Sequence, residues 1–309
     1  MGRLIEGRWS DEWYDTKATG GRFVRKESSF RDRVAADGST RFAPEAGRYH
    51  LYVSLACPWA HRTLIARAQK KLEHAISVSV VHPHMAEHGW TFANPDGTAD
   101  VTGDPIGAAK HLHEVYTAAD PTYTGRVTVP VLWDREHGTI VNNESAEILR
   151  MLNSEFDAIG DASVDLYPEP LRAEIDEVNE FIYPNVNNGV YRCGFATTQD
   201  AYEEAFAQLF AALDELDARL GRQRWLVGDQ ITEADWRFFT TLIRFDAVYV
   251  GHFKCNLRRI DEYAHLSGYL RELTQVPGIA ETVSLEHINR HYYESHGTIN
   301  PTGVVPFGP

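Results

Sequence analysis

A lone cysteine stands where an apolar run changes into a helical pattern. Cys57 follows the alternating apolar residues of 48–55, and Pro58 begins a stretch with apolar residues at intervals of three and four. Proline suits the first helical position, because the N–H that it lacks would have no partner within the helix there. Cys57 is therefore predicted at the positive end of a helix, where a thiol pKa of about 8.5 falls to about 3.5–7.5. A thiolate there is a nucleophile at neutral pH.

A single thiol favours one kind of redox chemistry. A Cys-x-x-Cys motif would have its second cysteine at position 60, but Ala60 stands there. Without an internal partner, Cys57 is suited to form a mixed disulfide with a small external thiol. An inert buried cysteine is the alternative, but the strand, Cys-Pro and helix together favour catalysis. Cys193 and Cys255 lack that context and are predicted to be inert.

Two further segments could hold a ligand. Pro130 heads a strand, where it cannot donate to a ladder, so a turn or edge with a cis bond suits it. The backbone of Val129 would then face Cys57 and pair with an extended peptide. Glu144 and Ser145 open a helix whose N–H groups and hydroxyl could hold a carboxylate, while Glu144 pairs with an ammonium. These charges match a γ-glutamyl group. An ordinary strand-start proline and plain helix capping are the alternatives.

The elements around these residues follow a recognisable order. Strands are predicted at 48–55, 76–81, 127–133 and 139–141, and helices at 58–68, near 107–118 and at 144–152. The first two strands should be parallel and the last two should form a hairpin, which gives a thioredoxin-like α/β domain. Helical spacing at 173–183, 201–220, 233–243 and 263–273 predicts an all-α helical bundle after it.

The predicted organisation has three parts. Residues 1–47 form an aromatic-rich arm packed on the body, 48–158 a thioredoxin-like thiol-binding domain, and 165–309 an α-helical substrate domain. A length of 309 residues fits two domains with their own cores.

Composition excludes several classes of function. A net charge of −14 argues against a nucleic-acid or anionic-membrane surface. The sequence has neither an apolar run of about 20 residues nor a signal-like N-terminus, and its three cysteines show no disulfide or zinc spacing. We therefore expect a cytoplasmic protein. No Gly-rich nucleotide loop or metal cluster is evident, and His82, His84 and His88 are predicted to be solvated.

Along essentially its whole length the chain resembles the glutathionyl-hydroquinone reductases, the Xi class of glutathione transferases. The matching stretches are 13–17, 54–62, 89–92, 125–133, 143–148, 187–191, 244–246, 248–250, 252–255 and 298–303. The resemblance implies a glutathione transferase fold and a homodimer. It also implies an enzyme that removes glutathione, its cosubstrate, from glutathionyl-hydroquinones.

The resemblance also implies roles for individual residues. Cys57 resembles the family nucleophile, and Trp90 the indole that covers the bound tripeptide. The implied γ-glutamyl contacts are Val129, Glu144 and Ser145, with Arg126 as a basic group nearby and Tyr191 and Tyr292 in the hydroquinone pocket. Taken singly, without the resemblance, the indole and the phenols would be better explained as core residues.

Three alternatives stay open. An omega-like thiol transferase or dehydroascorbate reductase would use the same cysteine with another acceptor. A non-enzymatic interaction module would leave the pKa of Cys57 at the ordinary value for a thiol. The acidic, Arg-rich composition also permits another low-molecular-weight thiol in place of glutathione.

Overall fold

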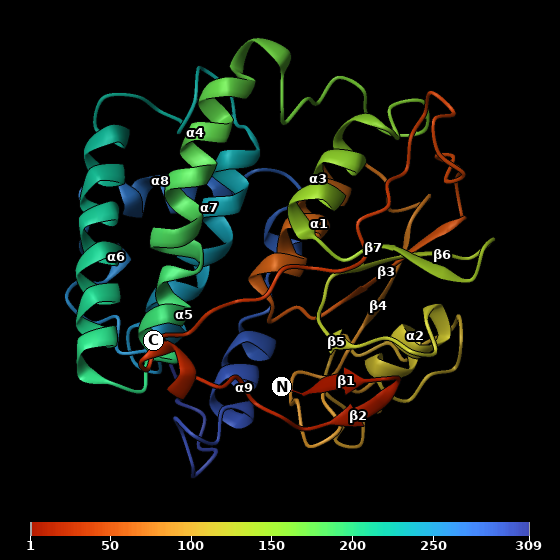
Figure 1. Cartoon of the computed structure of the whole chain (residues 1–309). Coiled ribbons are helices and arrows are strands. Elements are labelled where there is room, and N and C mark those ends of the chain that lie inside the picture. The colour runs from red at the N-terminus through yellow and green to blue at the C-terminus, as the bar shows by residue number, and fades with distance from the viewer. Residues whose placement is uncertain (1, 309) are drawn as a thin grey trace. The chain divides into compact units, whose positions relative to one another are not determined.

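The computed structural model describes residues 2–308, and the chain forms two compact units (Figure 1). The first comprises Met1–Trp13, Glu27–Val164 and Glu281–Ser295, and the second Tyr14–Lys26, Asp165–Ala280 and His296–Pro309. These bounds differ from the expected ones in two respects. The 1–47 arm is shared between the units, and the segment 281–295 joins the first unit instead of the helical one.

A four-stranded mixed sheet forms the centre of the first unit. Its order is β4-β3-β6-β7, with β3 (Tyr49–Val53), β4 (Ser77–Val80), β6 (Val131–Asp134) and β7 (Thr139–Asn142). β3 and β4 are parallel, whereas β6 pairs antiparallel with both β3 and β7. The predicted βαβ unit and hairpin are confirmed.

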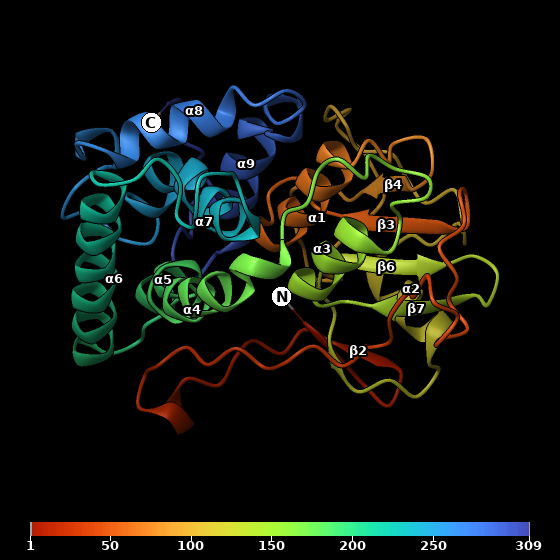
Figure 2. The same ribbon diagram turned by 90° about the horizontal axis from the view of Figure 1, so that it is seen from above.

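Helices cover both faces of this sheet. α1 (Pro58–Gln69) and α3 (Ser145–Ser154) pack together on one face, and α2 (Leu112–Ala119) lies on the other (Figures 1 and 2). A second antiparallel sheet joins β1 (Arg3–Ile5), β2 (Arg8–Ser10) and β5 (Gly125–Arg126). Sequence analysis missed it because strands of two or three residues are too short to show a period of two.

The last helix of the chain, α9 (Leu285–Ser295), also belongs to the first unit and was not predicted. His287 donates from Nε2 to the carbonyl of Ala99 (2.7 Å), and His291 donates from Nδ1 to the carbonyl of Pro83 (2.9 Å). These bonds hold α9 against the irregular segment that follows β4.

One histidine of that segment is buried, contrary to expectation. His82 was predicted to be solvated, but it is 4% exposed, and its Nε2 lies 3.1 Å from Asp96 Oδ1 and 3.2 Å from Thr98 Oγ1. The loop folds back so that these two polar side chains meet the ring. His84 and His88 are exposed, as expected.

The second unit is helical, as predicted. Its helices are α4 (Arg172–Ile182), α5 (Gly189–Gly194), α6 (Gln199–Leu220), α7 (Glu233–Arg244) and α8 (Leu266–Thr274). Short π-helical segments follow α4 at Tyr183–Asn187 and α7 at Phe245–Tyr249, and the remaining short helical turns of the chain are Lys17–Thr19, Glu169–Leu171, Ile260–Glu262 and Ala280–Thr282. α7 begins with a capping box, in which Thr232 and Asp235 exchange side-chain to backbone hydrogen bonds. Within residues 2–308, no helix has the length and hydrophobicity needed to cross a bilayer.

A buried ion pair joins β6 to the start of β3. Arg48 Nε and Nη2 bond the two carboxylate oxygens of Asp134 at 2.8 and 2.9 Å, and the two side chains are 7% and 0% exposed. Burial opposes ionisation of Asp134, but the bonds from Arg48 and His137 prevail and lower its pKa. A depressed carboxylate pKa stabilises the fold above the unfolded pKa of about 3.9, and that contribution is lost as pH falls towards the folded pKa.

We expect Arg48→Met to lower the free energy of unfolding by about 3 kcal/mol, because it strands a buried carboxylate. Urea denaturation at pH 7 measures the change. The double variant Arg48→Met/Asp134→Leu should recover most of the loss, since no buried charge is left unpaired. Wild-type stability in the single variant would contradict the role given to this pair.

Candidate functional site

Cys57 is the N-cap residue of α1. Its backbone is extended (φ −79°, ψ 121°), Pro58 occupies the first helical turn, and the thiol is half-buried. Every residue of α1 lies within the described part of the chain, and its first turn carries no acidic side chain. The positive end of the helix dipole therefore acts on the sulfur without a nearby carboxylate in that turn to offset it.

The backbone before β6 faces the cysteine. Cys57 Sγ lies 3.6 Å from the carbonyl oxygen of Val129, and the Val129–Pro130 bond is cis, as expected. Tyr116 Oη donates to the carbonyl of Thr128 at 2.8 Å and fixes the preceding peptide. The thiol and an extended backbone segment thus lie side by side, which suits a peptide-like ligand carrying a sulfur.

Glu144 is the N-cap of α3. Its Oε1 accepts the amide N–H of Ala146 (3.2 Å), and its Oε2 accepts the hydroxyl of Ser28 (3.1 Å). Ser145 donates to the same carboxylate at 3.4 Å. The capping that the sequence left as an alternative is present. Glu144 is half-buried, so the carboxylate is accessible to an ammonium group as well.

A buried guanidinium connects α1 to the start of α3. Arg62 is 1% exposed, its Nη1 lies 3.5 Å from Ser145 Oγ, and its Cζ lies 4.6 Å from the Trp59 ring centroid. Sequence analysis did not select Arg62, because its position in the Cys-Pro segment gave no sign that the charge would be buried. It places a positive charge behind the Ser145 hydroxyl.

Two predicted residues meet through a third that was missed. Trp90 is 4% exposed and stacks on His291 with ring centroids 4.6 Å apart and an interplanar angle of 27°. Tyr292 follows on α9, is 1% exposed, and has its ring 5.3 Å from that of His291. The one sign of His291 in the sequence is that it directly precedes Tyr292, a predicted site residue. The fold of the first unit therefore brings the indole and this phenol into one aromatic row.

Tyr191 lies on α5 in the second unit. It is 8% exposed, its ring meets Phe253 edge-on at 5.4 Å, and the Arg25 guanidinium lies 5.0 Å from its centroid. Arg25 Nε donates to Asn188 Oδ1 at 3.3 Å. Arg25 thus presents a positive charge to the face of the phenol, an arrangement that sequence analysis missed.

Arg126 lies on β5 in the first unit. Its guanidinium donates to the carbonyl of Glu12, and its backbone pairs with Arg3 of β1. The structure therefore joins this predicted ligand contact to the N-terminal strands.

The other two thiols lie together in the second unit. Cys193 and Cys255 are 2% and 0% exposed, and burial and the hydrogen bond with Cys193 raise the pKa of Cys255. Their burial agrees with the inert role expected for them.

We expect a sub-stoichiometric alkylating agent to modify Cys57 and leave Cys193 and Cys255 unmodified in the native protein. The reason is that alkylation needs an accessible thiolate, and the other two thiols are buried. Peptide mass spectrometry after brief treatment with iodoacetamide locates the label, and the same treatment in denaturant should label all three. Preferential labelling of Cys193 or Cys255 in the native state would contradict this.

Comparisons with known proteins identify the family of the chain. Residues 56–155 match the model of the glutathione S-transferase N-terminal domain, and 199–272 that of the C-terminal domain. The chain is 57% identical over 309 residues to glutathionyl-hydroquinone reductase PcpF of Sphingobium chlorophenolicum, covering all of this chain and 96% of that one.

Two solved structures extend the comparison. Glutathionyl-hydroquinone reductase YqjG of Escherichia coli is 56% identical over 315 residues, covering all of this chain and 95% of that protein. Its glutathione-bound structure superposes with a TM-score of 0.91 at 52% identity, covering 100% and 96% of the two chains. A Xi-class glutathione transferase from Natrialba magadii gives a TM-score of 0.93 at 51% identity, covering 100% and 93%. The chain belongs to the glutathionyl-hydroquinone reductase family, the Xi class of glutathione transferases.

Proposed function

We propose that this protein reduces glutathionyl-hydroquinones, releasing the hydroquinone and oxidised glutathione through a mixed disulfide on Cys57. One observation carries the proposal: a single thiol caps α1 and lies 3.6 Å from the Val129 carbonyl beside a cis-proline. The full-length relatives of 56–57% identity are named for this reaction, and one was solved with glutathione bound.

The first half of the reaction moves glutathione from carbon to sulfur. The Cys57 thiolate attacks the glutathione sulfur, the Cys57–S bond forms, and the sulfur–aryl bond breaks. The electron pair goes to the aryl carbon, which takes up a proton and leaves as hydroquinone. The Tyr191 and Tyr292 hydroxyls are our candidates for binding the hydroquinone oxygen and supplying that proton, since a phenol both donates and accepts.

The second half restores the enzyme. A second glutathione, as its thiolate, attacks the glutathione sulfur of the mixed disulfide, so oxidised glutathione leaves and the Cys57 thiolate returns. The aryl carbon is reduced by two electrons, and two glutathione sulfurs are oxidised to one disulfide. A serine or tyrosine in place of Cys57 could not hold this intermediate, which is why a cysteine selects reduction over conjugation.

The binding roles follow from local chemistry. Helix N–H groups and the Ser145 hydroxyl at the start of α3, backed by Arg62, suit the γ-glutamyl carboxylate, while Glu144 suits its ammonium. The Val129 backbone would pair with the cysteinyl part, Trp90 would cover the tripeptide, and Arg126 would lie near it.

The predicted homodimer and cytoplasmic location rest on family resemblance and composition, and light scattering of the pure protein tests the former.

The direct test is turnover with a trapped adduct. We expect the purified protein, given glutathione and a glutathionyl-hydroquinone, to release hydroquinone, and acid quenching to trap a Cys57 adduct one glutathione heavier by mass spectrometry. A low thiol pKa without turnover would redirect the test to γ-glutamylcysteine and mycothiol. Turnover without any adduct on Cys57 would overturn the mechanism.

A further inference from the structure

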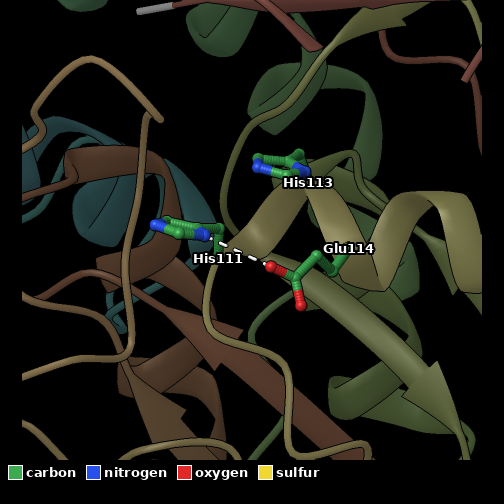
Figure 3. Close-up of side chains that lie close together, drawn as sticks. All are labelled: His111, His113 and Glu114. Atoms are coloured by element: carbon green, nitrogen blue, oxygen red, sulfur yellow. Dashed lines mark hydrogen bonds and ion pairs between the residues drawn. The ribbon is translucent and has the colours of Figure 1, made fainter. Parts of the chain in front are cut away.

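A cluster of imidazole and carboxylate groups lies at the start of α2, in the first unit. His111 is the N-cap of the helix, and His113 and Glu114 lie in its first turn (Figure 3). One ligand atom from each residue lies within 4.8 Å of the other two, and all three side chains are half-buried. None of them has a part in the thiol chemistry proposed above.

From this geometry we propose that His111, His113 and Glu114 bind a first-row transition-metal dication of the zinc type, with His88 as a fourth ligand. Imidazole nitrogen favours zinc, copper and nickel over magnesium and calcium, which prefer oxygen ligands. Two histidines and one carboxylate are a ligand set that zinc accepts.

One pair in the cluster is already at a chelating separation. His111 Nδ1 lies 3.2 Å from Glu114 Oε1, the contact drawn in Figure 3. Two ligands bound tetrahedrally at about 2.05 Å from zinc are about 3.3 Å apart, so a metal can replace the bridging proton with little movement. The other oxygen of Glu114 accepts the Lys110 amide at 3.1 Å, which fixes the carboxylate.

The third ligand needs a small rotation. Since the cluster spans up to 4.8 Å, the His113 ring must approach by up to about 1.5 Å to complete the set. The two histidine rings are already parallel, at an interplanar angle of 5° with centroids 5.3 Å apart.

The loop after β4 supplies the fourth group. The His88 ring lies 5.1 Å from that of His111, and Thr91 forms a backbone bridge with His111, which holds the loop beside the helix start. Trp9 stacks on the other histidine of the helix start, His113, with ring centroids 4.9 Å apart and 23° between the ring planes. A bound metal would therefore connect α2 to this loop and would shift the ring on which Trp9 rests.

Zinc binding is tested on untagged apo-protein in a Cys57→Ser background, which removes competition from the reactive thiol. We expect calorimetry to give one zinc ion per chain at this site and the variants His111→Ala and His113→Ala each to weaken it at least ~10-fold, by analogy with loss of metal-site groups. His88→Ala should weaken binding less than either. The matched control is His74→Ala, which alters an exposed histidine outside the cluster.

Fluorescence gives a second readout in the same background. Copper or nickel should quench the indole that stacks on His113, and Trp9→Phe should abolish that quenching step while zinc still binds. The far-ultraviolet circular dichroism of each variant verifies its fold. Absence of stoichiometric zinc binding in the folded Cys57→Ser protein, or binding that survives in His111→Ala/His113→Ala, would overturn the site and leave Glu114 as a helix cap.

Discussion

Replacing Cys57 with serine should lower kcat/KM for glutathionyl-hydroquinone reduction by at least ~1,000-fold, as expected for loss of a covalent nucleophile. A serine oxygen cannot form the mixed disulfide, so the glutathione adduct should disappear together with turnover. Hydroquinone release followed by chromatography measures the rate, and intact-protein mass spectrometry measures the adduct. Turnover that survives the change would show that Cys57 is not the nucleophile.

A matched control separates chemistry from structure. Cys193→Ala removes a buried thiol from α5 and should keep activity within about threefold of the wild type, as a residue outside the chemistry does. Thermal unfolding of both variants verifies that the loss in Cys57→Ser does not come from misfolding.

The same cysteine has an expected pH dependence. Because Cys57 caps α1, the helix dipole favours the thiolate, and the midpoint of its alkylation rate should lie well below the ordinary value of about 8.5. The rate should be low below that midpoint, where the thiol is protonated, and reach a plateau above it. A midpoint near the ordinary value would favour the alternative of an interaction module without catalysis.

Much of the first unit could be predicted because its signals are local. Alternation in β3 and helical spacing in α1 fix the strand and the helix on either side of Cys57 within a few residues. The cis bond at Pro130 could also be predicted, since a proline at a strand start has few places in a sheet. In these segments the local sequence is enough to predict the backbone conformation of each residue.

Features that depend on distant pairing could not be predicted. Segment 285–295 has its helical spacing, but tertiary contacts such as the hydrogen bond from His287 to Ala99 place it with the first unit. His82 was expected in solvent for the same reason, because its hydrogen-bond partners Asp96 and Thr98 lie on the returning loop.

The histidine cluster shows the same limit. Residues two apart do not face each other inside a helix, so His111 and His113 gave no metal spacing. The structure brings their rings together because His111 is the N-cap and has an extended backbone outside the helix. At this N-cap position the His111 side chain does not follow the direction that it would have inside the helix.

Replacing Tyr191 and Tyr292, the proposed proton donors, should separate the two halves of the reaction. We expect Tyr292→Phe to slow hydroquinone release by about 100-fold, in the range for loss of a general acid, and Tyr191→Phe to give a similar loss. Single-turnover measurements with excess enzyme follow this step. A phenylalanine keeps the ring, so the aromatic row of Trp90, His291 and residue 292 is retained.

Reduction of a small disulfide by glutathione provides the contrast. That reaction needs Cys57 but has no aryl carbon to protonate, so both tyrosine variants should retain it within about threefold while Cys57→Ser loses it. Tyr202→Phe, which removes a hydroxyl bonded to the Lys254 carbonyl, is the control and should affect neither reaction. If the site tyrosine variants lose both activities together, the hydroxyls are structural. If they lose neither, and disulfides turn over faster than glutathionyl-hydroquinones, the omega-like thiol transferase becomes the better description, since neither hydroxyl would then serve an aromatic acceptor.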